Sequence, residues 1–177
     1  MKKFAMAAAT AALLLSVSTG ALAATGLGSV TSMSGSAATA DKAGSVTANT
    51  TMCALELDDE GKIVSVSFDI AQNKIGFDAA GALTTDLAAE HPTKKELKEG
   101  YGMKAATSIG KEWYEQAEAL ENWCVGKTVA EVVGMPTYDK GDGHHTQVPD
   151  DVDLKSGCTI DVGSFLAAIQ KAADNAK

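Results

Sequence analysis

The chain has 177 residues, of which 45% are hydrophobic, and its 15 Lys and Arg against 23 Asp and Glu give a formal charge of −8. This length and hydrophobic content predict one domain with a substantial core, and they exclude a wholly disordered chain. The acidic balance argues against non-specific binding of nucleic acid or anionic lipid, because both polyanions need a basic surface.

The first 23 residues are typical of an export signal. Lys2 and Lys3 precede an apolar stretch from Ala5 to Val17, and a small-x-small cleavage site follows at 21–23. The apolar stretch is too short and too rich in Ala for a good membrane-spanning helix of about 20 residues. We therefore expect 1–23 to be a signal peptide on an exported protein, periplasmic or extracellular, that keeps no integral membrane segment after cleavage; an uncleaved N-terminal anchor is the alternative.

The next segment, 24–43, consists mainly of Gly, Ser, Thr and Ala and is either a flexible leader or the first strands of a sheet. Similar Gly-Ser-Val-Thr stretches at 28–31 and 44–47 are compatible with paired strands. We expect a single domain over 44–177.

A β-hairpin is predicted from two apolar runs, 51–57 and 63–70, because the polar, Gly-containing turn 58–62 separates them. The second run alternates with a period of two, which predicts one buried face made by Val64, Val66, Phe68 and Ile70. Residues 74–78 are a candidate short third strand.

Helical signals follow the strands. Capping boxes at Thr93–Glu96 and Thr128–Glu131 predict two short helices, and apolar residues spaced at helical intervals predict an amphipathic helix over 113–124 that ends before Gly126. Residues 137–153 read as a loop, and a C-terminal helix follows. Strands first and helices afterwards predict an α+β domain, an antiparallel sheet with helices packed on one face.

Three cysteines, Cys53, Cys124 and Cys158, lie in the exported part. An odd number leaves at least one without an intramolecular partner, and three buried small apolar side chains are an equally good interpretation. His144 and His145 lie in the acidic loop and are either metal ligands or part of a solvated loop, although adjacent His side chains usually point apart.

The stretch from Asp153 to Thr159 reads D-x-x-S-G-x-T. It resembles the signature of the FMN-binding domain family of exported bacterial proteins, which includes a subunit of sodium-pumping quinone reductases and electron-transport flavoproteins. In detail it looks closer to a secreted branch related to surface immunogen-type lipoproteins. The resemblance implies an FMN-binding-domain-like fold, FMN as the cofactor, and a binding site made by Asp153, Ser156, Gly157, Cys158 and Thr159. In flavinylated members a separate transferase uses FAD to attach FMN to the final Thr, which is Thr159 here.

The residue types suit this chemistry on their own account. A Thr hydroxyl can be esterified by a phosphoryl group, and Gly157 permits a positive φ and close approach to the backbone. A helix beginning near Asp161 would direct unpaired N–H groups at the phosphate. The neighbouring Asp side chains would repel such a phosphate, and Lys155 is the nearby cation that offsets their charge. The alternative is a plain turn at Ser156–Gly157, with Asp161 as the cap of the last helix.

Aromatic side chains on the 113–124 helix could stack on a flavin ring. Trp113 lies on the apolar stripe and is expected in the core, whereas Tyr114 and Trp123 lie off it and are the better candidates for ligand contact.

The sequence thus predicts an exported flavin-binding domain that carries electrons, rather than an enzyme with its own substrate. Its partners would be membrane or envelope redox proteins, and a flavin transferase if the flavin is covalent. A cofactor-free secreted binding domain that retains the fold is the alternative, and metal capture by the His144–His145 loop is a third hypothesis.

Overall fold

The computed structural model describes residues 24–177, so the predicted signal peptide lies outside the described residues. Its elements follow one another as strands and then mostly helices, which confirms the predicted α+β class. In chain order they are β1 Ala24–Ser36, β2 Gly44–Leu57, β3 Ile63–Phe77, α1 Lys94–Leu97, the 3-10 helix η1 Lys98–Tyr101, α2 Trp113–Cys124, α3 Val129–Val133, β4 Thr137–Tyr138, β5 Val148–Pro149 and α4 Gly163–Asp174.

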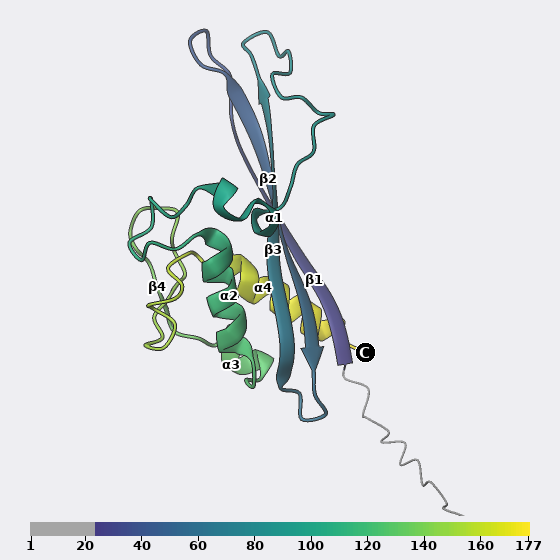
Figure 1. Cartoon of the computed structure of the whole chain (residues 1–177). Coiled ribbons are helices and arrows are strands. Elements are labelled where there is room, and N and C mark those ends of the chain that lie inside the picture. The colour runs from purple at the N-terminus through teal and green to yellow at the C-terminus, as the bar shows by residue number, and fades with distance from the viewer. Residues whose placement is uncertain (1–23) are drawn as a thin grey trace, which may run out of the picture.

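The three long strands form one antiparallel sheet in the order β1-β2-β3 (Figure 1). Most of the segment 24–43 is therefore strand rather than flexible leader. The two Gly-Ser-Val-Thr stretches do lie on the paired strands β1 and β2, but they are not opposite each other: Gly28 pairs with Cys53, and Gly44 pairs with Phe77. Residues 74–77 continue β3 and do not make a separate strand.

The hairpin between β2 and β3 is confirmed, but its buried face differs by one residue from the prediction. Phe68 and Ile70 are buried as expected and Val66 is half-buried, whereas Val64 is 47% exposed. The cause is a bulge: Glu56 pairs with Ser65 and Leu57 pairs with Ile63, so Val64 has no opposite residue. An extra residue in one strand exchanges the two faces beyond it, and Ile63 is buried instead.

Helices α1, α2 and α3 begin or end where local signals place them. Thr93 and Thr128 each make both hydrogen bonds of a capping box, at the starts of α1 and α3. Helix α2 ends at Cys124, and Gly126 follows with a φ of 81°, a left-handed conformation that favours glycine. The predicted loop 137–153 is confirmed for most of its length, apart from the short pair β4–β5.

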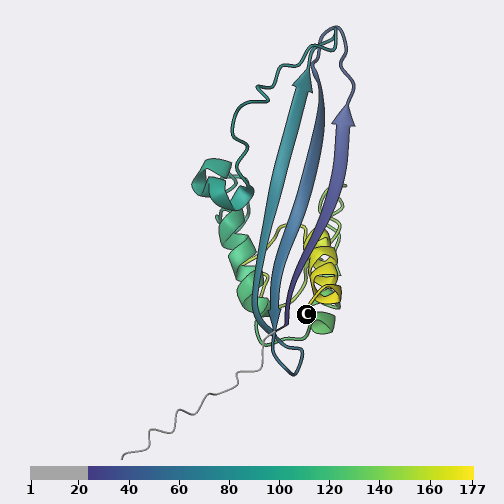
Figure 2. The same cartoon turned by 90° about the vertical axis from the view of Figure 1, so that its right-hand side faces the viewer.

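The helices cover a single face of the sheet (Figures 1 and 2). Helix α4 contacts β1 and β2, and α2 contacts β3. Trp113 is buried in the core between these layers, as predicted, with its ring 6.0 Å from that of Phe165, which lies 5.1 Å from the Phe68 ring. The C-terminal ends of β1 and β3 and the N-terminal end of β2 extend beyond the helical layer (Figure 1). We call these three strand ends the arm.

All three cysteines are free thiols inside the core. Burial is the main cause that raises the pKa of Cys53 and of Cys124 to about 12, and the pKa of Cys158 to about 11. The three side chains therefore behave as small apolar residues. Within residues 24–177, no helix is both long and apolar enough to span a bilayer.

Two glycines of β1 let α4 lie directly on the sheet. A Cβ atom at Gly26 would be 1.9 Å from the carbonyl oxygen of Ala172, and one at Gly28 would be 2.1 Å from that of Ala168. Such distances exclude any side chain, since the obstacle is helix backbone that has no rotamer to change. The partners on α4, Ala168 and Ala172, are themselves fully buried small residues.

We predict that Gly28→Ala lowers the free energy of unfolding by roughly 1–3 kcal/mol, because the new methyl group separates α4 from β1. Urea unfolding followed by circular dichroism measures this change. Gly100→Ala is the matched control: a Cβ there meets nothing within 4 Å, so its effect should stay within about 0.5 kcal/mol. Equal stability of the two variants would contradict the assigned packing.

Candidate functional site

The D-x-x-S-G-x-T stretch forms a compact turn that leads into α4. Its anchor is Leu154, which is buried and whose carbonyl oxygen accepts hydrogen bonds from the N–H groups of Gly157 and Cys158. Cys158 is fully buried, whereas Ser156 and Asp153 are exposed. The turn therefore presents some of the predicted site residues to solvent and uses the others in packing.

Gly157 is needed for close packing of the turn against α2, and the predicted positive φ is absent. It is buried, and a Cβ atom there would lie 2.9 Å from the Cβ of Ala119 on α2. The left-handed conformation occurs at seven other glycines of the described chain but not at Gly157. The glycine thus places the turn directly on α2.

Thr159 lies half-buried at the end of this turn, and Gln116 of α2 holds it. The Gln116 Oε1 atom accepts two hydrogen bonds from Thr159, one from the backbone N–H at 2.9 Å and one from Oγ1 at 3.2 Å. Gln116 itself is fully buried, although it is polar. Its Nε2 group donates to the Lys111 carbonyl oxygen at 3.2 Å and to Thr107 Oγ1 at 3.3 Å. One buried amide of α2 therefore joins the motif turn to the loop that contains Thr107 and Lys111.

A cation lies beside the same residue. The Lys140 Nζ atom donates a hydrogen bond of 2.8 Å to the carbonyl oxygen of Thr159. An ammonium group has three donors, so two remain for another acceptor. Lys111 also lies close to the motif. Burial raises the pKa of Cys158, and the positive charges of Lys140 and Lys111 oppose part of this rise. These two lysines come from outside the motif.

Two of the Asp side chains near the motif are engaged with other groups, one with a lysine and one with neutral N–H groups. Asp150 makes an ion pair with Lys155. Asp161 accepts hydrogen bonds from the N–H groups of Thr146, Gln147 and Gly163. Both carboxylates therefore have partners of their own.

The N-terminus of α4 is not available as an anion site in the way the sequence suggests. The helix begins at Gly163 rather than near Asp161, and Asp161 Oδ1 accepts the Gly163 N–H at 3.0 Å. The N-cap residue is therefore Val162 and not the predicted Asp161, although the Asp161 side chain still accepts the first N–H of the helix. Lys140, rather than the helix terminus, is a positive group in direct contact with the motif's Thr.

The aromatic candidates are not brought together with Thr159. Tyr114 precedes Gln116 by two residues, about 200° round the helix, and its hydroxyl donates to Glu99 at 2.9 Å. The Trp123 ring already lies under the Lys127 Nζ atom, 4.3 Å from its centroid.

The His144–His145 loop is held by its own aspartate. Asp142 accepts the N–H groups of both His residues, and its other oxygen lies 2.6 Å from His145 Nδ1. These hydrogen bonds keep the pKa of Asp142 well below its usual range. In residues 24–177, no group of three or more His, Cys, Asp or Glu side chains is arranged to hold a metal ion.

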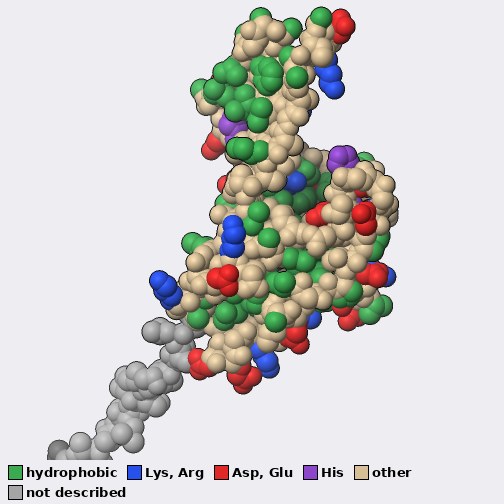
Figure 3. Space-filling model, turned by 180° about the vertical axis from the view of Figure 1, so that it is seen from behind, with side chains coloured by type: hydrophobic (Ala, Val, Ile, Leu, Met, Phe, Trp, Pro, Cys, Tyr) green, Lys and Arg blue, Asp and Glu red, His purple; other side chains and the backbone are tan. Residues whose placement is uncertain are grey.

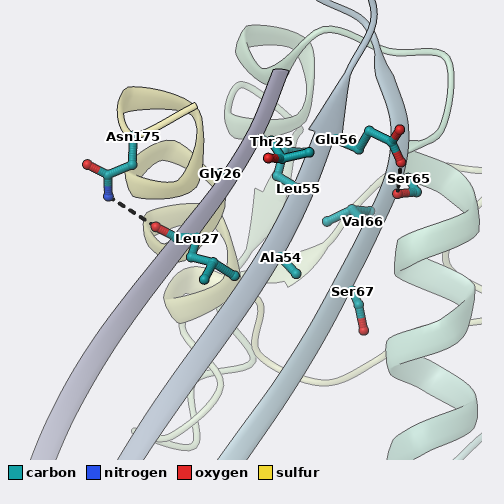
Figure 4. Close-up of a pocket in the computed structure, with 10 residues that line it drawn as sticks. All are labelled: Thr25, Gly26, Leu27, Ala54, Leu55, Glu56, Ser65, Val66, Ser67 and Asn175. Atoms are coloured by element: carbon teal, nitrogen blue, oxygen red, sulfur yellow. Dashed lines mark hydrogen bonds between the residues drawn. The ribbon is translucent and has the colours of Figure 1, made fainter. Parts of the chain in front are cut away.

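The uncovered face of the sheet carries a shallow hollow of about 680 Å³ (Figure 4). Leu27 and Ala54 project into it from neighbouring strands, and Asn175 of the C-terminus borders it and donates to the Leu27 carbonyl oxygen. Helix α4 has 12 residues and so measures about 18 Å, and the hollow lies near its C-terminal end whereas Thr159 precedes its N-terminal end. The hollow and the motif are therefore separate features.

The signal for Gln116 was present in the sequence. It is a polar residue three positions after Trp113 and four before Leu120, inside the apolar stripe of α2. A buried polar residue needs hydrogen-bond partners, so such a position indicates a polar contact in the core. The positions of Thr107, Lys111 and Lys140 beside Thr159 had no comparable signal.

Comparison with known proteins gives one partial match. The chain is 40% identical over 95 residues to a protein from Desulfitobacterium hafniense described as a chlorophenol reductase. The match covers 48% of this chain and 29% of the relative, so the chain corresponds to less than a third of that protein's length. No family model and no solved structure matches the chain.

We predict that Gln116→Leu lowers the free energy of unfolding by about 1–3 kcal/mol, because it leaves the Thr159 N–H and the Lys111 carbonyl without a buried partner. Amide hydrogen exchange at Thr159 should become faster in the same variant. Gln170→Leu, an exposed position on α4, is the control and should change stability by no more than about 0.5 kcal/mol. An unchanged exchange rate at Thr159 would contradict the conclusion that Gln116 holds this residue by hydrogen bonds.

Proposed function

We propose that this protein is an exported flavin-binding domain that carries electrons outside the cytoplasm, with FMN joined through its phosphate to Thr159. The observation that carries the proposal is a half-buried Thr hydroxyl, at the end of the D-x-x-S-G-x-T turn, with the Lys140 ammonium hydrogen-bonded to the same residue. In this role the flavin supplies the redox chemistry, and the chain supplies attachment and electrostatic surroundings.

The residues present fit a phosphodiester at this position. Esterified Thr159 Oγ1 loses the hydrogen bond that it donates to Gln116, at a cost of about 1 kcal/mol, but the Thr159 N–H keeps its own bond to the same oxygen. The free donors of Lys140 suit a phosphate oxygen, and hydrogen bonds to a charged acceptor are stronger than neutral ones. The nearby Asp150 carboxylate is paired with the Lys155 ammonium group, which lowers its repulsion of a phosphate.

The attachment step balances with FAD as the co-substrate of a flavin transferase. The Thr159 Oγ1 atom attacks the phosphorus on the FMN side of the FAD pyrophosphate and gives up its proton. A new P–O bond forms, the pyrophosphate P–O bond breaks, and AMP leaves. No oxidation or reduction occurs in this step. Gln116 and Lys140 would hold the acceptor residue in place, and the electron-transfer partners would be a membrane or envelope donor and an acceptor.

The partial relative agrees with a redox setting, because its description names it a reductase. The chlorophenol belongs to that protein, of which this chain matches less than a third. For this chain we therefore propose a carrier of electrons and assign no substrate.

A second function, a cofactor-free secreted binding domain with the same fold, is favoured by a different observation. The uncovered sheet face has a mostly apolar hollow, remote from Thr159 (Figure 4). Exposed apolar concavities are common at binding sites. The two functions make opposite predictions for flavin content.

We predict that protein purified from its native host absorbs visible light as an oxidised flavin does, and that intact mass shows one FMN-phosphoryl adduct. Thr159→Ala should abolish the adduct, because it removes the esterified oxygen. Ser156→Ala removes the other, more exposed hydroxyl of the same turn and should leave the adduct in place. Colourless native protein without an adduct would refute flavin attachment and favour the cofactor-free binding domain.

We further predict that Lys140→Met reduces the initial rate of flavinylation by a transferase about tenfold or more, since about 1.5–3 kcal/mol of a charge-assisted hydrogen bond is lost. Lys140→Arg should retain much of that rate. Lys74→Met is the matched control, because that lysine is also exposed but lies on β3, away from the motif turn. Equal rates for the Lys140→Met and Lys74→Met variants would contradict a role for Lys140 at the phosphate.

A further inference from the structure

The two edges of the sheet are protected very differently. Along β3, the Phe68 N–H donates to the Glu121 carboxylate, and Gly76 pairs with Thr84 and Thr85 near the end of the strand. A side chain and a loop thus cover parts of that edge, whereas the outward groups of Gln72 and Lys74 between them have no partner among residues 24–177. The charged Lys74 side chain protects this short stretch against pairing with another strand.

The edge of β1 is covered along only half of its length. Its outward-facing carbonyl and N–H groups belong to the odd-numbered residues: Thr25 pairs with Lys177, the Leu27 carbonyl accepts from Asn175, and the Ser29 carbonyl accepts from Lys171. The next odd-numbered residues are Thr31, Met33 and Gly35. Among residues 24–177, none of their outward backbone groups has a partner. This open half belongs to the arm that extends beyond the helices (Figure 2).

The open half of β1 lacks the devices that usually prevent strand pairing. Residues 24–40 contain no charged side chain and no proline, in a chain with a formal charge of −8. Charged side chains and prolines are the common means by which natural edge strands avoid other chains. Like-charge repulsion between two copies is therefore small where the backbone is unpaired.

Apolar side chains gather on the same arm (Figure 3). Met33 of β1 is 75% exposed. On the same face of the sheet, Val46 of β2 is 44% exposed and Ile75 of β3 is 39% exposed. Leu83 and Leu87 of the loop after β3 add to the exposed apolar surface. Contiguous apolar surface of this kind marks an interaction site.

We propose that a second copy of this chain binds here, by antiparallel pairing of the two β1 strands about a two-fold axis at Met33. Met33 would then pair with its own copy and Thr31 with Gly35 of the other chain, which makes about six backbone hydrogen bonds. Both three-stranded sheets join into one, and the two Met33 side chains meet on the face that carries Val46 and Ile75. We favour a second copy because each copy brings the same uncharged edge in an otherwise acidic chain, and the pairing satisfies the outward groups of Thr31, Met33 and Gly35 in both chains at once.

The geometry keeps the two helical bodies apart. A pairing centred on Met33 places residues before it in one chain opposite residues after it in the other. The half of β1 that α4 covers therefore lies beyond the tip of the other copy's arm. This interface uses neither the motif turn nor Thr159, so the proposal does not depend on flavin binding.

Sedimentation velocity of the full chain over a concentration series tests the proposal. We expect a monomer–dimer equilibrium, and Met33→Lys should raise its dissociation constant roughly fivefold or more, because two like charges would face each other directly. Asn73→Lys adds the same charge to the same face of the arm but on β3, and should leave the constant nearly unchanged. A monomer at every concentration, or equal effects of the two variants, would overturn the proposal.

Cross-linking gives an independent readout of the register. In Met33→Cys the paired Cα atoms would be about 5.5 Å apart, within disulfide range, so oxidation should give a covalent dimer. In Ser32→Cys the two Cα atoms would be about 8 Å apart, too far for a disulfide. The three native thiols are buried and do not compete. Cross-linking at Ser32→Cys equal to that at Met33→Cys would overturn this register.

Discussion

The contact of α4 with β1 is the constraint on which the rest of the structure depends. Gly26 and Gly28 remove the side chains that would separate the helix from the sheet, and Ala168 and Ala172 do the same on the helix side. Close packing of two backbones fixes the helix axis and its position along the strand. The N-terminal end of α4 then places the motif turn next to α2, and its C-terminal end places Asn175 and Lys171 on the edge of β1.

The candidate site follows from this arrangement and from one buried amide. The Gln116 oxygen accepts from the motif turn and its nitrogen donates to the loop with Thr107 and Lys111, so one side chain connects the two. A satisfied buried polar group of this kind restricts the local geometry more than apolar packing does. The Thr159 hydroxyl is therefore held in a defined place, and the lysine that contacts its backbone is supplied by a different loop.

The covered face and the uncovered face of the sheet serve different purposes. The covered face makes the core, with all three cysteines and most of the large apolar side chains in it. The uncovered face keeps a hollow near the C-terminus and an apolar arm at the other end. An antiparallel sheet can leave one face in water because its alternation of side chains separates the two environments.

The sequence by itself determined the features that depend on residues within about four positions of one another. The capping boxes at Thr93 and Thr128, the turn between β2 and β3, and the amphipathic face of α2 belong to this class, and so does the α+β order of elements. The tertiary structure alone decided which residues meet across long separations. The bulge that exposes Val64, the strand identity of 24–36, the approach of Lys140 to Thr159 and the half-open edge of β1 all depend on such contacts. The reason is that a local pattern specifies a conformation and a buried face, whereas packing between elements chooses the partner for that face.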